Sequence, residues 1–426
     1  MSWAGREGAR VALVAALVLG IVLVLVVALR TPWTVLPVPS GGHAPVDPTA
    51  GLTTAQVDRA RSFAAAVRPA SLAALLLSLL VAGGLGLTPV GARLVAAVAK
   101  PFGGGWIWQV FLGAVALSII GRLITLPLSA YGEVVYHRYG LSTSSWGLWL
   151  RDVAVTTAIN AGLTALALLG LVALARSAPR TWWLWAAVGA AGLVVAGSFL
   201  YPVLLEPAFN RFSSLPAGTL RTDLLELAQR NGTPVRDVLV ADASRRTTAL
   251  NAYVSGFGST RRIVVYDTVL RRLPARQIES IAAHELGHVA ADDVLTGTLI
   301  GSLGAAAGVA LLGWLLSSAW LLTRAGAEGP ADPRVIPLLL FLVAAGTLLS
   351  TPLQNAVSRQ IEARADVHAL DLSRDSQDFV AMQRRLAVSG LAEPDPPAVW
   401  QWFFGSHPTT AQRVAFARDW ERLGRG

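Results

Sequence analysis

The pentapeptide His284-Glu285-Leu286-Gly287-His288 is the stretch that decides both the fold and the chemistry of this chain. Pro274 precedes it, and apolar residues recur at helical spacing around it, so we predict a helix here. Two histidines four residues apart project from one face of a helix, about 5.4 Å from each other along the axis. Both imidazoles can reach one Zn²⁺ at about 2.0–2.1 Å, and Glu285 can lie beside a metal-bound water as a general base.

The competing interpretation is a pair of structural histidines that bracket a glutamate by chance. It requires two of only six histidines in the chain to fall four residues apart, with a glutamate in the one suitable position between them. The motif therefore favours a metal site, which the rest of the sequence has to complete.

Composition points to a membrane protein. Hydrophobic residues make up 54% of the chain and charged residues 14%, whereas soluble proteins carry about 25% charged residues. The absence of cysteine excludes disulfides, thiolate metal ligands and a cysteine nucleophile. The net charge of +9 comes almost wholly from arginine, with no dense basic run, so we predict no nucleic-acid partner.

Apolar runs predict seven membrane spans. The first begins after Arg6 and Arg10 and is long enough to cross a bilayer. It exceeds the apolar region of a signal peptide, and no small-residue cleavage site follows it, so we predict an uncleaved span. The predicted spans cover residues 11–29, 71–87, 106–128, 153–175, 182–205, 294–322 and 335–353.

The predicted fold is a mainly α, polytopic membrane protein in which about seven helices enclose a chamber. Arg122 and Asn160 lie within spans, where such side chains face a bundle interior or a water-filled cavity. For Arg122 the alternative is a side chain that snorkels from near the end of its span. A small α+β region carries the metal helix. We expect four segments: 1–205 with the first five spans, 206–293 as a catalytic insertion, 294–357 with spans six and seven, and 358–426 as a C-terminal helical segment.

The insertion predicts a small sheet beside the metal helix. Residues 222–231 form an amphipathic pattern that ends at Gly232, and residues 237–240, 251–254 and 262–266 read as strands. An exposed edge strand could hold an extended peptide through main-chain hydrogen bonds. This arrangement would align a peptide for cleavage.

A catalytic zinc site needs a third protein ligand. The candidates after the metal helix are Glu362, Asp366, His368 and His407. Glu362 and Asp366 are four residues apart and share one helix face, so one can bind the metal while the other accepts a hydrogen bond from an imidazole. His368 points elsewhere, and we predict a structural role for it.

The ordered set of motifs resembles the type I CAAX prenyl endopeptidase family, which are integral-membrane zinc metalloproteases of the gluzincin kind. The resemblance implies a ring of seven helices around a water-filled chamber. It further implies that His284, His288 and Glu362 bind one zinc ion per chain and that Glu285 activates the water. The motifs lie at residues 133–142, 206–212, 251–253, 262–270, 284–288, 358–366 and 406–408, followed by Arg413.

The same resemblance implies roles for four further residues. Asp366 would be an acid close to the metal site, and Asn251 would bind the substrate backbone on the edge strand. His407 and Arg413 would lie near the reacting carbonyl. Eukaryotic members often carry His-Ser before the Asn-Ala-Tyr motif, whereas Ala249-Leu250 stand there in this chain, so a polar contact to substrate is missing.

The expected function is a zinc metalloendopeptidase that cuts peptide bonds near the membrane. Its partners would be the bilayer and a peptide or protein substrate, lipidated or membrane-inserted. The Arg- and Ala-rich composition favours a bacterial plasma membrane. Basic residues on short loops are equal in number on the two sides, so only the resemblance assigns the catalytic side to the cytoplasm.

Three alternatives remain open. A heat-shock type quality-control metalloprotease would use the same zinc residues without a prenyl requirement. A site-2 intramembrane protease would carry its motif inside an apolar span, which the charged residues around 276–279 and 292–293 argue against. A seven-span transporter or receptor with a structural metal is the non-enzyme alternative.

Overall fold

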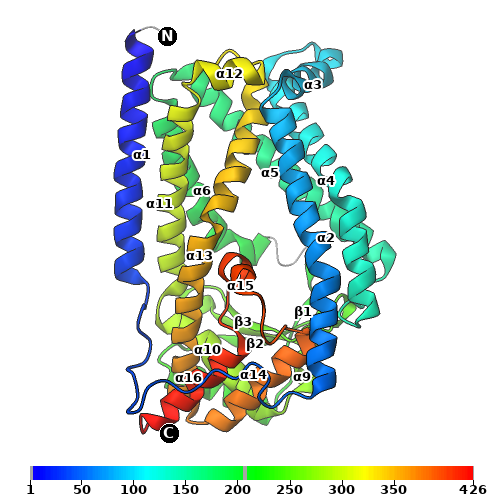
Figure 1. Cartoon of the computed structure of the whole chain (residues 1–426), viewed down its shortest axis with the longest axis vertical. Coiled ribbons are helices and arrows are strands. Elements are labelled where there is room, and N and C mark those ends of the chain that lie inside the picture. The colour runs from blue at the N-terminus through cyan, green and yellow to red at the C-terminus, as the bar shows by residue number, and fades with distance from the viewer. Residues whose placement is uncertain (1–2, 205–208, 426) are drawn as a thin grey trace.

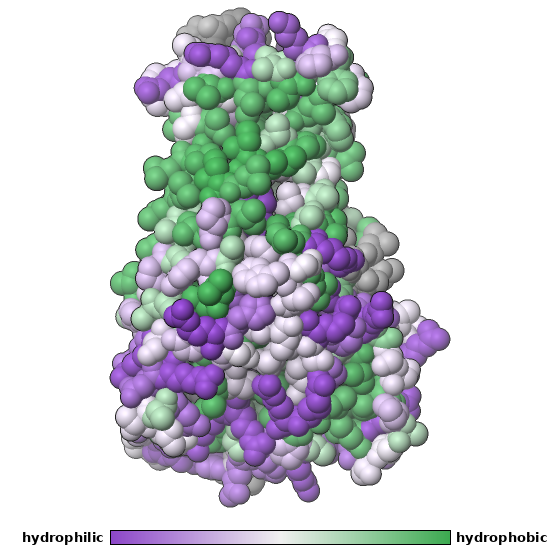
Figure 2. Space-filling view, turned by 90° about the vertical axis from the view of Figure 1, so that its right-hand side faces the viewer, coloured by the Kyte–Doolittle hydropathy of each residue, from purple (hydrophilic) through white to green (hydrophobic). Residues whose placement is uncertain are grey.

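The protein is a tall helical bundle above a base of shorter helices and strands (Figure 1). Figure 2 shows that this lower part is largely hydrophilic, and we call it the polar base. The structure, a computed structural model, describes residues 3–204 and 209–425. The predicted end of the fifth span at Leu205 and the first residues of the motif at 206–212 fall outside the described residues. The helices of the bundle are α1 (Trp3–Arg30), α2 (Thr54–Gly86), α3 (Pro89–Ala99), α4 (Trp106–Arg138), α5 (Trp146–Ser177), α6 (Trp182–Leu204), α11 (Asp293–Leu315), α12 (Ala319–Ala325) and α13 (Ile336–Ser373).

Seven of the described helices are long and apolar enough to cross a membrane: α1, α2, α4, α5, α6, α11 and α13. Figure 2 shows a broad hydrophobic band over the upper half, between a hydrophilic rim and a hydrophilic lower half. Large apolar side chains of the spanning helices stay exposed, such as Leu29 of α1 and Leu349 of α13. Since water would not favour such a surface, the band marks the bilayer. The seven predicted spans are confirmed, and the chain is an integral membrane protein.

Two of these helices continue far beyond the bilayer. The second span, predicted to begin at residue 71, is the last part of one longer helix, α2, which begins at a capping box between Thr53 and Gln56. The seventh span and the charged segment after it are likewise one helix, α13, of 38 residues. Polar residues at the membrane surface change the pattern of the sequence without breaking the helix.

The sixth span is shorter than predicted. Helix α11 ends at Leu315, and α12 begins after Ser318, whose hydroxyl accepts a hydrogen bond from the backbone N–H of Leu321. This N-cap divides the apolar run expected to reach residue 322 into two helices. The short helix α3, which starts at Pro89 behind the N-cap Thr88, was not predicted.

The side chains proposed to line a chamber have different environments. Arg122 is half-buried, and its Nη1 lies 3.5 Å from Ser129 Oγ on the same helix. Its Nε has no hydrogen-bond partner among the described residues. Asn160 is exposed. The chamber itself stays a prediction.

The polar base contains a four-stranded sheet in the order β1-β2-β4-β3. β2 and β4 are parallel, and each pairs with an antiparallel outer strand, so β1 and β3 are the edges. Gly256 after β3 has a φ of 89°, and a Cβ there would collide with Thr260. The three predicted strands are present, and β1 was not predicted. The strands are β1 (Phe212–Ser214), β2 (Asp237–Ala241), β3 (Ala252–Ser255) and β4 (Arg262–Tyr266).

Helices pack around this sheet to form a second core. It buries Leu224, Ile263, Ile278, Phe379 and Trp420, which come from five different elements. The predicted C-terminal helical segment contributes three helices after the end of α13. The helices of the base are α8 (Thr219–Arg230), α9 (Asp267–Arg272), α10 (Ala275–Ala290), α14 (Ser376–Gly390), α15 (Ala398–Phe404) and α16 (Thr410–Arg422). Short 3-10 helices lie at Lys100–Phe102, Ala243–Arg245, Gly258–Thr260 and Pro333–Val335.

Candidate metal centre

Helix α10 carries both motif histidines on one face. Pro274 caps the helix, and the buried side chains of Ile278, Ile281 and Leu286 fix its orientation against the core. The Nε2 atoms of His284 and His288 lie 3.2 Å apart, and their rings are nearly perpendicular, at 86°. The pair therefore presents two nitrogens to one point, as the spacing predicts.

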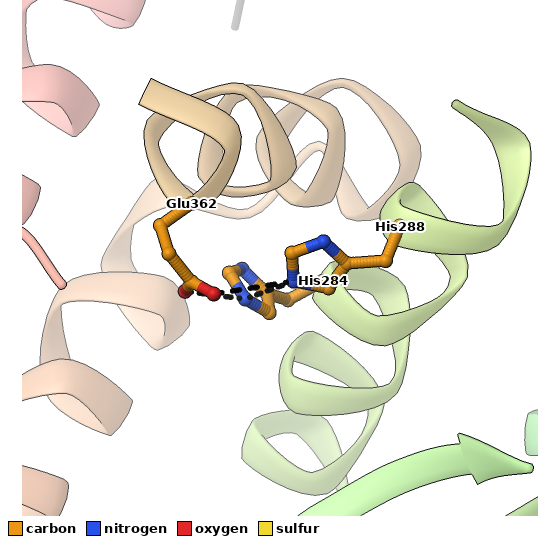
Figure 3. A group of neighbouring side chains, drawn as sticks. All are labelled: His284, His288 and Glu362. Carbon is orange, nitrogen blue, oxygen red and sulfur yellow. Dashed lines mark hydrogen bonds and ion pairs between the residues drawn. The ribbon is translucent and has the colours of Figure 1, made fainter. Parts of the chain in front are cut away.

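Glu362 reaches the same point from α13, which packs beside α10 (Figure 3). Its Oε2 is 3.3 Å from His284 Nε2, and its Oε1 is 3.6 Å from His288 Nε2. Two ligands that are 2.0–2.2 Å from a tetrahedral zinc ion lie about 3.3–3.6 Å from each other. The spacing of the three side chains, and their nitrogen and oxygen donors, therefore fit a zinc ion.

A carboxylate stands behind each imidazole. Asp366, which is fully buried, lies 3.0 Å from His284 Nδ1. Asp293, at the start of α11, lies 2.9 Å from His288 Nδ1. Such partners fix the tautomer of each ring, so that Nε2 is left free to bind a metal.

Each of these carboxylates in turn contacts an arginine. Arg413 of α16 pairs with Asp366, with Nε donating a hydrogen bond of 2.8 Å. Arg364 of α13 pairs with Asp293. Sequence reasoning proposed Arg413 as a substrate-binding residue, and the structure turns its guanidinium toward Asp366. Sequence reasoning missed Asp293 and Arg364, for which the one available signal was an acidic residue five positions after His288.

Glu285 lies between the two histidines on α10 and is half-buried. Burial raises the pKa of its carboxyl group above the ordinary value. A carboxylate with a raised pKa holds a proton more readily, which suits a group that accepts a proton and passes it on.

His407 approaches the centre from the loop between α15 and α16. Its Nε2 is 3.5 Å from Glu362 Oε2, and its side chain is 59% exposed. The Ser406 hydroxyl lies 2.9 Å from the other ring nitrogen, and Gln401 Nε2 donates a hydrogen bond to the His407 carbonyl. His407 is thus held beside the three candidate ligands with an accessible ring.

Asn251 is the residue directly before edge strand β3, and it is exposed. Its carbonyl accepts a hydrogen bond from the Tyr266 N–H, which anchors it to β4. Strand β3 packs beside α10. The Asn251 side chain makes no hydrogen bond to the metal-centre residues within the described structure, and its role stays a prediction.

His368, for which the sequence predicts a structural role, pairs with Asn231 rather than with the three candidate ligands. Its Nε2 is 2.6 Å from Asn231 Oδ1, and Asn231 Nδ2 donates to the carbonyl of Leu286. The His368 ring also lies against Gly287, where an added Cβ would be 3.1 Å from it. This contact lets α13 approach α10 closely enough for Glu362 to reach the histidines.

Family models match most of the chain. Residues 214–421 match peptidase family M48, and residues 44–211 match the N-terminal domain of CAAX prenyl proteases, which is described by five membrane helices. The metal-centre residues all lie in the first of these regions.

Comparisons with individual proteins agree with these family matches. An uncharacterized metalloprotease of Bacillus subtilis, YhfN, is 34% identical over 307 residues, covering 72% of both chains. A CAAX prenyl protease 1 homolog of rice, Oryza sativa, is 29% identical over 316 residues, covering 71% of this chain and 72% of its own. The crystal structure of S. mikatae Ste24p superposes with a TM-score of 0.78 at 21% identity, over 95% of this chain and 99% of that one, which shows a shared fold.

Proposed function

This chain belongs to peptidase family M48, and we propose that it is a zinc-dependent endopeptidase that cuts substrates near the membrane surface in the manner of the CAAX prenyl proteases. Membership of this family makes the protein a membrane metalloprotease, which argues against the transporter or receptor alternative. The observation that carries the proposal is the 3.2–3.6 Å spacing of the donor atoms of His284, His288 and Glu362.

These three residues would hold one zinc ion. When bound there, zinc would polarise the scissile carbonyl and lower the pKa of a water molecule toward about 7. Glu285 takes a proton from the attacking water as the water oxygen forms a bond to the carbonyl carbon. It then returns the proton to the amine as the carbon–nitrogen bond breaks, so the products are a carboxylic acid and an amine.

The remaining residues assist this reaction. Asp366 accepts the Nδ1–H of His284 and keeps that ring in the ligating tautomer. His407, next to Glu362, donates a hydrogen bond to the developing oxyanion. Asn251 binds the substrate backbone as the peptide adds to edge strand β3. Arg413 holds Asp366 through its guanidinium, and the direct substrate contact that the resemblance implies stays part of the proposal.

The biological setting is also part of the proposal. We infer a bacterial plasma membrane, supported by the relative in Bacillus subtilis. We place the metal centre on the cytoplasmic side, as the resemblance to the CAAX prenyl endopeptidases implies. The substrate is a peptide or protein, and the prenylated class is supported by the names of the rice and other CAAX prenyl protease relatives. The second candidate is quality control of membrane proteins without a prenyl requirement.

The test compares a short farnesylated CAAX peptide with its unprenylated twin, using purified protein and Glu285→Gln. We expect the wild type to cut, o-phenanthroline to abolish cleavage, and Glu285→Gln to retain zinc without cutting. Faster cleavage of the farnesylated peptide supports the CAAX-like function, and equal rates support quality control. A Glu285→Gln protein that cuts as fast as the wild type would overturn the mechanism.

A further inference from the structure

Two adjoining cavities lie in the polar base, away from the metal centre. Their volumes are about 510 and 350 Å³, and they share Leu52, Gln56, Arg272, Val388 and Ser389. Four arginines line them, and we call the combined space the arginine pocket. No acidic residue lines either cavity in the described part of the chain. The four are Arg59 of α2, Arg272 at the end of α9, and Arg384 and Arg385 of α14.

The charge of this pocket is not neutralised. None of the four arginines forms a salt bridge with a carboxylate among residues 3–204 and 209–425. Three of them donate single hydrogen bonds to backbone carbonyls of Tyr139, Thr248 and Arg272. A guanidinium has five N–H donors, and these three arginines are exposed, so most of their donors face solvent and can turn to a ligand.

Among the four arginines, Arg384 gives the strongest indication that the pocket binds an anion. Its Nε is buried without a hydrogen-bond partner in the described structure, which is a costly state for a charged group. Gly51, with a φ of 76°, lies against its guanidinium so closely that a Cβ there would collide with it. The arginine is therefore held in place by packing rather than by a carboxylate.

The position of the pocket relates it to the path of a peptide. Thr248 and Leu250, which line it, lead directly into edge strand β3. Antiparallel pairing is the commoner kind, and a peptide antiparallel to β3 ends with its C-terminal residues near the start of that strand. The C-terminal side of a bound substrate would therefore point toward the arginines.

The distance between the pocket and the metal centre is one that a short extended peptide can span. Leu273 lines the pocket and lies 11 positions before His284, and nearly all of that stretch is helix α10. This corresponds to about 16 Å at 1.5 Å per residue. An extended peptide covers that distance in about five residues, and in fewer once the arginine side chains extend toward it.

The pocket lies too far from the bilayer to serve a lipid headgroup. Arg59 is 12 residues before the start of the second predicted span at residue 71, and the helix between them is continuous. The separation is about 18 Å along α2, whereas the headgroup layer on each side is only about 5–8 Å thick. An anion that binds to these arginines therefore comes from solution or from the substrate.

We propose that the arginine pocket binds the free C-terminal carboxylate of the peptide substrate, so that the enzyme recognises a short tail by its end. This inference rests on the proposed function, because it assigns the pocket to the substrate of that reaction. A free α-carboxylate is the one anion that a peptide carries at this position whatever its side chains are.

The test uses one cleaved peptide in two forms, with a C-terminal carboxylate and with a C-terminal amide. Charge-assisted hydrogen bonds predict a preference for the acid of about tenfold or more in kcat/KM, most of it in KM. Arg384→Gln should bring the ratio of the two rates close to one, and Arg384→Lys should restore part of it. Since both peptides are cut by the same preparation, a loss of folded enzyme cancels in this ratio.

Arg236→Gln is the matched control, because Arg236 is exposed, precedes β2 and forms no salt bridge within the described residues. It should keep the full preference for the acid. Equal cleavage of the two peptides by the wild type would overturn the proposed role of the pocket, and the proposed function would still stand. Equal cleavage with inhibition by inorganic phosphate would assign the pocket to a free anion instead. If neither peptide is cut in a Glu285-dependent way, the proposed function itself fails.

Discussion

Asp293 Oδ2 lies 2.9 Å from Nδ1 of His288, on the side of the imidazole that faces away from Glu362. The two residues are joined across the turn between α10 and α11, and Arg364 contacts the same carboxylate. Asp366 and Arg413 repeat this arrangement behind His284. Each candidate ligand histidine is therefore oriented by a carboxylate that is itself held by an arginine.

Replacing Asp293 should weaken metal binding. We expect Asp293→Ala to raise the zinc dissociation constant about 10–100-fold, because the His288 ring loses the partner that fixes its tautomer. Competition with a chromophoric chelator measures this constant directly. Asp292→Asn is the matched control, because Asp292 is adjacent and exposed. Its backbone has a positive φ of 52°, a conformation that asparagine tolerates. Unchanged affinity in Asp293→Ala would contradict an orienting role.

Arg413 should act on stability as well as on catalysis. Arg413→Met would leave the fully buried Asp366 carboxylate without its cationic partner, at a cost of about 3–5 kcal/mol. Denaturant unfolding in detergent measures the loss, with Arg418→Met on the same helix as the control. A protein of normal stability whose KM alone rises would instead favour direct substrate binding by Arg413.

Gly287 should not tolerate a side chain. A Cβ at this position would lie 3.1 Å from His368, so Gly287→Ala should force α10 and α13 apart. We expect a destabilisation of about 1–3 kcal/mol together with weaker zinc binding. Gly297→Ala in α11 is the control, because nothing lies within 4 Å of a Cβ there. The prediction fails if both variants bind zinc as tightly as the wild type.

His407 should contribute to the rate rather than to metal binding. If its ring donates to the oxyanion, His407→Ala should lower kcat about 10²–10³-fold and leave the zinc content unchanged. Steady-state kinetics and metal analysis on one preparation separate the two effects. Zinc loss in this variant would show that His407 acts as a further ligand through its proximity to Glu362.

Removing the metal should lower thermal stability as well as activity. Zinc bound to the native state alone adds about 2.7 kcal/mol of stability at a free concentration of 100 times the dissociation constant. We therefore expect chelated protein to unfold at a lower temperature than zinc-loaded protein, and added zinc to restore both stability and cleavage. Identical unfolding curves would indicate that the site does not hold zinc under these conditions.

Local sequence patterns predicted the features that depend only on residues close together in the sequence. The spacing of His284 and His288 determines their shared helix face, and the apolar runs determine the spans. The same patterns divided α2 and α13 wrongly, because hydrophobicity changes at the membrane surface while helical hydrogen bonding continues. Strand β1 and helix α3 were missed because three and eleven residues give too short a pattern.

Contacts between distant segments were much harder to predict. Glu362 and Asp366 emerged together as candidates, and only the packing of α13 on α10 directs the first toward Nε2 and the second toward Nδ1 of His284. The pair Arg364 and Asp293 joins positions 71 residues apart, and nothing in either neighbourhood signals the other. The arginine pocket likewise combines three helices that are remote in sequence.

The division of the donor set between α10 and α13 has a consequence for biogenesis. His284 and His288 precede α11, whereas Glu362 follows the apolar part of α13, so the chain crosses the bilayer twice between them. A nascent chain that carries only the histidine motif lacks its carboxylate donor until the last two spans are inserted. Peptidase activity would thus arise only after membrane integration is complete, which protects the cell from an unanchored, active protease during synthesis.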